Sequence, residues 1–219
     1  MDRSTVMSTA NILLAISVII LSSLSYGETS QESVQYLQKE WAIDNYKLVG
    51  KAQKDAFIAL IEQADKRVSE HPQSAELYTW RGIIKSTYAG VKGGLGALKY
   101  AKAAKSDLEK ALELDASALQ GSAYTSLGTL YFNVPGWPIG FGDDEKAEEL
   151  LKKALTINPD GIDPNYFYGD YLRNEKRYTD AKVYMQKALQ AAPRAGRELA
   201  DQGRRKEIRQ VLAEIENRL

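Results

Sequence analysis

Two short stretches of the chain have residue types that could bind a phosphate group or a metal cation. Residues 93–98 read GGLGAL, and the backbone N–H groups of a glycine-rich turn can hold a phosphate. A phosphate loop also needs a preceding strand and a Lys-Ser/Thr pair that opens the next helix, and a dinucleotide site needs a third glycine. The chain lacks these companions, so we interpret residues 93–98 as a turn.

The second stretch, Gly142-Asp143-Asp144-Glu145, brings three acidic side chains together. A calcium-binding EF-hand loop requires alternating oxygen ligands and a closing glutamate, and this stretch does not have that spacing. Acidic residues in the first turn of a helix are stabilised by the positive end of the helix dipole. We therefore predict that a helix begins here and that the stretch is not a metal site.

The residue types of most catalytic sites are scarce. The chain has no cysteine, which excludes disulfides, thiolate metal sites, thiol catalysis and lipid attachment through an N-terminal cysteine. Its one histidine, His71, closes a helical stretch, so a catalytic triad or a multi-histidine metal site would have to be built around that residue alone. We predict that His71 lies at a helix end, and that the protein is not an enzyme and needs no cofactor.

The C-terminal section is locally basic. Six basic residues are interspersed with three acidic ones, which leaves about three excess positive charges: Arg194, Arg197, Arg204, Arg205, Lys206 and Arg209 against Glu198, Asp201 and Glu207. We interpret this section as the solvated outer face of a helix. The alternative is a site for an anionic ligand.

The chain as a whole carries no excess charge. Its 219 residues include 29 Lys and Arg and 29 Asp and Glu, so neither nucleic acid nor an anionic membrane surface is favoured as a partner. With 26% charged and 44% hydrophobic residues, the composition is that of a globular protein with a sizeable core.

The N-terminus has the layout of a secretory signal. Residues 12–21, ILLAISVIIL, form an uncharged apolar run after Arg3 and before small and polar residues, and this run is short for a membrane span. Ser25 and Gly27 place small residues where a signal peptidase reads the chain, so we predict cleavage after Gly27 and a periplasmic protein. Because Asp2 offsets Arg3, a retained membrane anchor stays open as the alternative.

The second half of the chain contains an internal repeat. Three similar segments lie 43 and 34 residues apart: LEKAL at 108–112, LKKAL at 151–155 and MQKAL at 185–189. A period of 34 residues is typical of the tetratricopeptide repeat, a pair of antiparallel helices that requires small residues at fixed places.

The last two units have the small residues of that pattern. In residues 162–195, the pattern positions are filled by Gly169, Ala181, Ala188 and Pro193, and Asp163-Pro164 is predicted to cap and open the first helix. Residues 121–161 begin with the family's aromatic-x-x-Leu-Gly-x-x-Tyr pattern, with tyrosine in the tryptophan position: Tyr124, Leu127, Gly128 and Tyr131.

The chain therefore resembles the tetratricopeptide repeat (TPR) superfamily across residues 72–195. More narrowly, it is similar to small exported TPR proteins of Gram-negative bacteria. It is distantly similar to the T-component proteins of tripartite ATP-independent periplasmic (TRAP) transporters, which also have a helical repeat body.

Two of the repeats carry insertions between their first and second helices. Residues 75–118, a more degenerate unit with Gly82 and Ala104, have ten extra residues, and residues 121–161 have seven. Adjacent units of a solenoid place equivalent loops on one edge, so we predict that the insertions meet. In this interpretation three apolar side chains of the second insertion pack as a brace on three of the first: Trp137, Ile139 and Phe141 on Val91, Leu95 and Leu98. The alternative is that the second insertion is an exposed binding lip.

We predict an all-α fold, a right-handed TPR-like helical solenoid with N-terminal helices and a C-terminal capping helix. The predicted boundaries are a signal peptide at 1–27, an N-terminal helical region at 28–74, repeats at 75–118, 121–161 and 162–195, and a capping helix at 196–219. The apolar spacing of Val34, Leu37 and Trp41 supports the first region, and that of Ile208, Val211 and Ile215 supports the capping helix.

The resemblance implies a protein-interaction or scaffold module of the cell envelope, without catalytic activity, that binds a protein or peptide. The alternative is a periplasmic component that handles a small ligand with a TRAP-type transporter. Besides Trp137, Ile139 and Phe141, the candidate partner-binding residues are those that fall on the concave face of TPR proteins: Phe132, Asn133, Tyr166, Asp170, Arg173 and Asn174.

Overall fold

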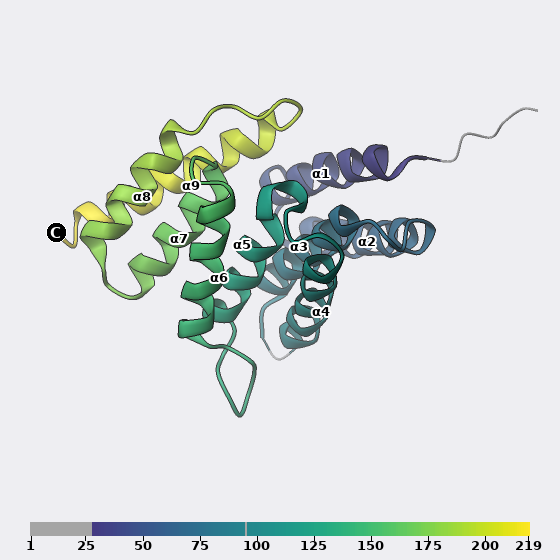
Figure 1. Ribbon diagram of the computed structural model, residues 1–219, viewed down its shortest axis with the longest axis horizontal. Helices are drawn as coiled ribbons and strands as arrows, with labels where there is room; N and C mark the ends of the chain where they lie inside the picture. Colours follow the sequence, from purple (N-terminus) through teal and green to yellow (C-terminus); the bar gives the residue numbers. More distant parts are fainter. Residues whose placement is uncertain (1–27, 95) are drawn as a thin grey trace, which may run out of the picture.

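The computed structural model describes residues 28–94 and 96–219, and within these ranges every regular element is a helix. The helices are α1 (Ser30–Tyr46), α2 (Gly50–Glu70), α3 (Ala75–Lys92), α4 (Ala97–Asp115), α5 (Ala118–Asn133), α6 (Asp144–Ile157), α7 (Ile162–Asn174), α8 (Tyr178–Gln190) and α9 (Glu198–Glu216) (Figure 1). The expected signal peptide, with its cleavage point after Gly27, lies outside the described residues.

The helices form a right-handed solenoid of TPR-like pairs, which confirms the predicted fold class. The pairs α3/α4, α5/α6 and α7/α8 each pack through a glycine on the first helix and a larger side chain on the second. A Cβ on Gly82 would lie 2.7 Å from Cγ of Leu108, and a Cβ on Gly128 would lie 2.8 Å from Cγ of Leu151. A Cβ on Gly169 would lie 3.2 Å from Cε of Met185. The glycines therefore allow the paired helices to approach closely.

Alanines complete the same contact on the second helices. Those of the three pairs are fully buried: Ala104 and Ala111, Ala147 and Ala154, and Ala181 and Ala188. This burial is the one expected from the repeat pattern.

The helices α1 and α2 precede the pairs and pack on α3. Their apolar stripes are buried as predicted, and Trp41 contacts Trp80 of α3 edge to face, with 5.9 Å between the ring centroids. His71 caps the C-terminus of α2, and its Nε2 lies 2.9 Å from the carbonyl oxygen of Glu28. The helix-end position predicted for His71 is confirmed.

The insertion in the first pair lengthens the helices and does not form a long loop. Helix α3 continues to Lys92 and α4 begins at Ala97, because Tyr88 and Ala101 are both buried and extend the apolar contact beyond the repeat. The connection contains Gly93 and Gly94, both with φ of 64°, a backbone conformation that glycine adopts without strain. The predicted turn at residues 93–98 is therefore shorter than expected.

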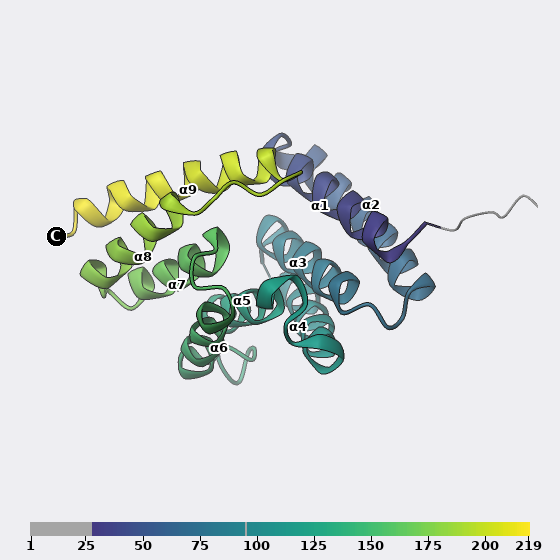
Figure 2. The same cartoon turned by 45° about the horizontal axis from the view of Figure 1, so that its top comes forward.

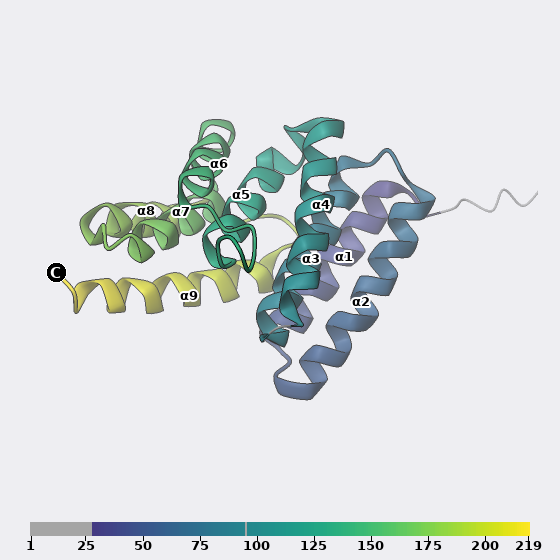
Figure 3. The same cartoon turned by 90° about the horizontal axis from the view of Figure 1, so that it is seen from below.

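The last helix, α9, crosses the open side of the arch formed by the other helices (Figures 2 and 3). Its first half packs on the N-terminal helices: Ala200 lies in their core, and a Cβ on Gly203 would lie 2.4 Å from the Tyr46 ring. Its second half packs on α7 and α8 through Ile208 and Ile215, both fully buried. Thus α9 caps the last repeat, as predicted, and also joins it to the beginning of the fold.

Among the described helices, none is long and apolar enough to cross a membrane.

Two glycine substitutions test the packing of the pairs. Gly128→Ala should lower the free energy of unfolding by about 1 kcal/mol or more, because overpacking against Leu151 costs about 1–3 kcal/mol and exceeds the gain in helix propensity. In Gly90→Ala, the control in α3, the new Cβ would meet nothing within 4 Å, so the variant should gain about 0.5–1 kcal/mol. Urea denaturation measures both. Equal stabilisation of the two variants would contradict the close packing.

Candidate functional site

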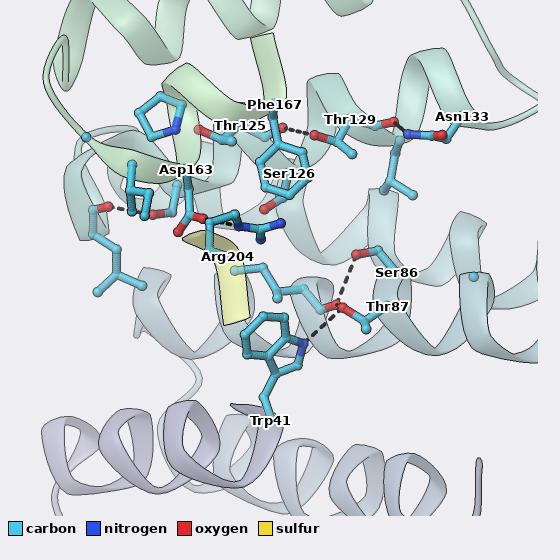
Figure 4. Close-up of a pocket in the computed structure, with 18 of the residues that line it drawn as sticks. Trp41, Ser86, Thr87, Thr125, Ser126, Thr129, Asn133, Asp163, Phe167 and Arg204 are labelled. Atoms are coloured by element: carbon cyan, nitrogen blue, oxygen red, sulfur yellow. Dashed lines mark hydrogen bonds and ion pairs between the residues drawn. The ribbon is translucent and has the colours of Figure 1, made fainter. Parts of the chain in front are cut away.

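A cleft of about 1590 Å³ lies inside the arch, between α3, α5, α7 and the segment that leads into α9. Its walls mix apolar and hydroxyl side chains (Figure 4). The apolar ones include Trp41, Trp80, Ile83, Leu130 and Phe167, and the polar ones include Ser86, Thr87, Thr125, Ser126, Thr129 and Asn133. A concave site of this composition is suited to ligand binding.

Several hydroxyl groups of the cleft are held by their own helices. The hydroxyl of Thr87 donates to the carbonyl oxygen of Ile83 at 2.9 Å and accepts from Nε1 of Trp41 at 3.0 Å, which ties α1 to α3. Thr129 donates to the carbonyl oxygen of Thr125 at 2.8 Å. These side chains have fixed orientations, and each hydroxyl oxygen keeps a lone pair that can accept a hydrogen bond from a ligand.

The wall at the start of α5 has a strained backbone. Leu119 and Gln120, both lining residues, have φ of 49° and 56°, values that cost non-glycine residues about 1–3 kcal/mol. The amide of Asn158 donates to Oε1 of Gln120 at 2.9 Å and helps to hold this conformation. Such strain is common where a site is shaped for a ligand.

One end of the cleft is formed by a network of charged residues centred on Asp163. Its carboxylate accepts from Nη1 of Arg194 at 2.6 Å and from Nε of Arg204 at 2.9 Å. Arg194 also contacts Asp201 at 2.6 Å, and Arg204 contacts Glu207 at 2.6 Å. Burial favours the protonated form of Asp163, but Arg204 and Arg194 outweigh it and hold the pKa of this carboxyl well below its usual range.

This network corrects the predicted role of Asp163. The N-cap of α7 is Gly161, which makes no side-chain cap, and Asp163 lies one residue inside the helix. Its carboxylate is directed to the two arginines instead, because they offer charge-assisted hydrogen bonds that are stronger than a bond to a backbone N–H. By contrast, Asp143 caps α6 by accepting from the backbone N–H of Lys146 at 2.9 Å, as predicted.

The interpretation of the basic C-terminal section as a solvated face is wrong for several of its arginines. Arg194, Arg197 and Arg204 line the cleft, and the side chain of Arg204 is only 10% exposed. Arg205 donates to the carbonyl oxygens of Leu189 and Ala191. Lys206 and Arg209 do lie on the exposed face. The section differs from a surface helix because α9 packs on both ends of the fold.

The loop at residues 134–143 connects α5 to α6 beside the cleft. Gly142 donates to the carbonyl oxygen of Pro135 at 3.0 Å, and Asp143 donates to that of Tyr131 at 3.0 Å. A Cβ on Gly142 would lie 1.9 Å from the carbonyl oxygen of Val134, so glycine is needed for this close approach. The loop is therefore a compact, hydrogen-bonded structure.

The predicted brace is wrong for two of its three side chains. Trp137 is 89% exposed and Ile139 is 64% exposed. Only Phe141 packs inward, edge to face on Tyr131 at a centroid distance of 5.5 Å. The hydrogen bonds of the loop close its backbone on itself and leave Trp137 exposed, while Phe141 is anchored next to the start of α6.

Residues of both insertions border the cleft: Leu98 and Gly94 from the first, and Ile139 and Val134 from the second. Val91 packs on the N-terminal core instead of the loop, and Leu95 lies outside the described residues.

The residues predicted to lie on the concave face do not form one surface. Asn133 lines the cleft, whereas Phe132 packs on Tyr171 at a centroid distance of 5.8 Å. On α7, the face that was expected to be open is covered by α9. The guanidinium of Arg204 lies 4.3 Å from the Tyr166 ring centroid, where burial raises the pKa of Tyr166 to about 12.

The other candidates on α7 do not line the cleft. Arg173 pairs with Asp170 at 2.7 Å and with Glu214 of α9 at 3.6 Å. Asn174 is exposed at the end of α7. These residues are therefore separate from the cleft.

Sequence reasoning did not bring together five residues that line the cleft: Trp41, Trp80, Asp163, Arg197 and Arg204. The local basic excess left an anionic-ligand site open for Arg197 and Arg204, but it does not show that residues 41 and 204 border one space. On α7, the predicted Tyr166 does not line the cleft, whereas its sequence neighbour Phe167 does.

Comparisons with known proteins support the repeat assignment. The tetratricopeptide repeat model matches residues 139–160 and 162–194. A search of curated protein sequences gives no match. The structure of TTC0263, a thermophilic TPR protein of Thermus thermophilus, is similar with a TM-score of 0.55 and 16% identity, over 85% of this chain and 98% of that one. At this identity the likeness shows the fold alone.

Two further structures have lower TM-scores. The MamA protein gives 0.44 with 18% identity, and pilF of Pseudomonas aeruginosa gives 0.35 with 16% identity; each match covers 85% of this chain and 90% of the other. These scores are too low to show a shared fold.

TPR-like folds are typically protein–protein interaction modules, with a concave surface that binds the partner.

The charged network predicts a large effect of one carboxylate. Asp163→Asn should lower the free energy of unfolding by about 3 kcal/mol, because the nearly buried Arg204 would keep its charge with Glu207 as its remaining ion-pair partner, and Arg194 would keep Asp201. Asp160→Asn is the control: this carboxylate is 85% exposed, and its one ion pair with a described residue is that with Lys187 at 3.2 Å, so the change should be below about 1 kcal/mol. Chemical denaturation at neutral pH measures both. Similar small losses would show that the network contributes little.

Proposed function

We propose that the chain is an exported, non-catalytic protein-interaction or scaffold module of the cell envelope, and that its partner docks on the tip of the 134–143 loop. The observation that carries this proposal is the exposure of Trp137 and Ile139 on a loop that is itself hydrogen-bonded. Large apolar side chains held out in water are unfavourable for a monomer and favourable in a complex, and tryptophan is common at interface hot spots.

The form of the loop supports docking. Its backbone is fixed by Gly142 and Asp143 and by the packing of Phe141 on Tyr131, so little conformational entropy is lost when a partner binds. The fold class supports a protein partner, since repeat solenoids generally present extended binding surfaces.

The proposed export rests on the N-terminal sequence. An apolar run at residues 12–21 followed by Ser25 and Gly27 is typical of a cleaved secretory signal. This part of the proposal is independent of the loop.

A second candidate function is supported by the path of α9. An open groove suits an extended protein segment, whereas a more enclosed cavity with a few converging polar groups suits a small ligand. Because α9 crosses the arch and its leading segment lines the cleft, the second candidate is a periplasmic component that handles a small ligand in association with a TRAP-type transporter.

Replacing the exposed tryptophan tests partner docking. Trp137→Ser should abolish capture of a protein from an envelope extract and change the melting temperature little, because the side chain makes few contacts within the molecule. Val183→Ser is the control, since Val183 is a 57% exposed apolar residue on α8, away from the loop. The partner is defined as a protein captured by the wild type and by Val183→Ser but not by Trp137→Ser. Identical capture by all three would refute docking at the loop.

Intact-mass measurement tests export. After expression of the full chain in a Gram-negative host, periplasmic material should contain a species that begins at Glu28, because the peptidase is predicted to cleave after Gly27. A mass equal to that of the full chain in the membrane fraction would instead establish an anchored protein.

A further inference from the structure

Arg197 differs from the other basic side chains of the cleft. Four basic and two acidic residues line it: Lys187, Arg194, Arg197 and Arg204 with Asp160 and Asp163. Lys187 pairs with Asp160 at 3.2 Å, and Arg194 and Arg204 share Asp163. Arg197 makes no ion pair with any described residue; its guanidinium lies over the Trp80 ring, 4.9 Å from the centroid.

The same two side chains contain buried donors without acceptors. Nε of Arg197 and Nε1 of Trp80 are buried and have no hydrogen-bond partner among the described residues. Trp80 is only 4% exposed, and both residues line the cleft. Buried N–H groups are nearly always satisfied in folded proteins, so these two donors, on side chains that lie one over the other, are available to an acceptor from outside the chain.

The electrostatic environment favours an acceptor that carries negative charge. Burial and the neighbouring Arg194 lower the pKa of Arg197 to about 10, which still leaves the guanidinium charged at neutral pH. A partly desolvated cation of this kind is stabilised by an anion, and guanidinium groups bind carboxylate and phosphate oxygens well.

The surroundings of this position are mostly apolar. Trp41 contacts Trp80, with 5.9 Å between the ring centroids, and Ile83, Leu119 and Phe167 line the same cleft. A ligand that brings an oxyanion to Arg197 would therefore place the rest of its body against hydrocarbon. An apolar body gains free energy when it leaves water for such walls.

We propose that the cleft binds a small amphipathic organic anion, whose oxyanion group accepts hydrogen bonds from Arg197 and from Nε1 of Trp80 and whose apolar body lies along the wall of Trp41, Ile83 and Phe167. The inference rests on the second candidate function, the handling of a small ligand. A small molecule fits better than a protein segment because α9 crosses the cleft side of the arch and covers Tyr166.

Calorimetric titration of the full chain with matched probes tests the proposal. Octanoate and octyl phosphate have the anionic group and the chain, 1-octanol has the chain alone, acetate has the charge alone, and acetyl-tetraalanine represents a peptide C-terminus. Octanoate or octyl phosphate should bind at least about tenfold more tightly than 1-octanol, because a hydrogen bond to a charged group accounts for about that ratio. The tighter of these two probes identifies the headgroup as a carboxylate or a phosphate.

Substitutions then locate the anion. Arg197→Gln should weaken the tighter anionic probe about tenfold and leave 1-octanol unchanged. Arg209→Gln is the matched control, since Arg209 is an exposed arginine of α9, and it should leave both probes unchanged. Trp80→Phe keeps one aromatic ring and removes the N–H group together with the five-membered ring of the indole. It should therefore weaken the anionic probe by a larger factor than 1-octanol, and it supplies a second test if Arg197→Gln does not fold.

The outcomes separate the levels of the proposal. Binding of none of the probes would overturn both the inference and the ligand-handling function. Equal affinity for octanoate, octyl phosphate and 1-octanol would overturn the anion site alone. Tightest binding of acetyl-tetraalanine would assign the cleft to a peptide end, and unchanged affinities in Arg197→Gln and Trp80→Phe would move the anion elsewhere. Protein docking at Trp137 is independent of all these results.

Discussion

The ion pairs of Asp163 with Arg194 and Arg204 fix the path of the last helix, and the arrangement of the site depends on that path. Asp163 lies at the start of α7, Arg194 lies in the segment between α8 and α9, and Arg204 lies in α9. With this anchor in place, Ala200 enters the core of the N-terminal helices and Ile208 enters that of α7 and α8. A helix that could have been only a terminal cap therefore links both ends of the solenoid.

This link changes what the concave face can bind. An open solenoid would expose the α7 face that contains Tyr166 and Arg173, but here α9 contacts both side chains. What remains accessible is the cleft and the exposed tip of the 134–143 loop. The proposed ligand site at Arg197 and Trp80 and the proposed docking site at Trp137 are therefore formed by different residues, although Ile139 of the loop also borders the cleft.

The sequence was sufficient for the pairs because their packing depends on residue size at a fixed spacing. Gly128 and Ala154 are recognisable from the repeat, and both are buried as expected. The path of α9 could not be predicted, since an apolar stripe shows that Ile208 is buried but not which helix covers it. In the sequence Arg204 cannot be distinguished from a surface arginine, because its burial is favourable only through the tertiary contact with Asp163. Within one loop, composition likewise could not separate the packed Phe141 from the exposed Trp137.

Hydrogen exchange in α9 tests the closure of the arch most directly. Residues 201–206, whose N–H groups are hydrogen-bonded within the helix, should exchange as slowly as residues 207–216, because both halves are packed on a core and open only with a large part of the fold. In Asp163→Asn, exchange of residues 201–206 should accelerate much more than that of residues 207–216. Fast exchange of residues 201–206 in the unmodified protein would contradict the account, since it would show that α9 is attached only to the last repeat and that the cleft is open.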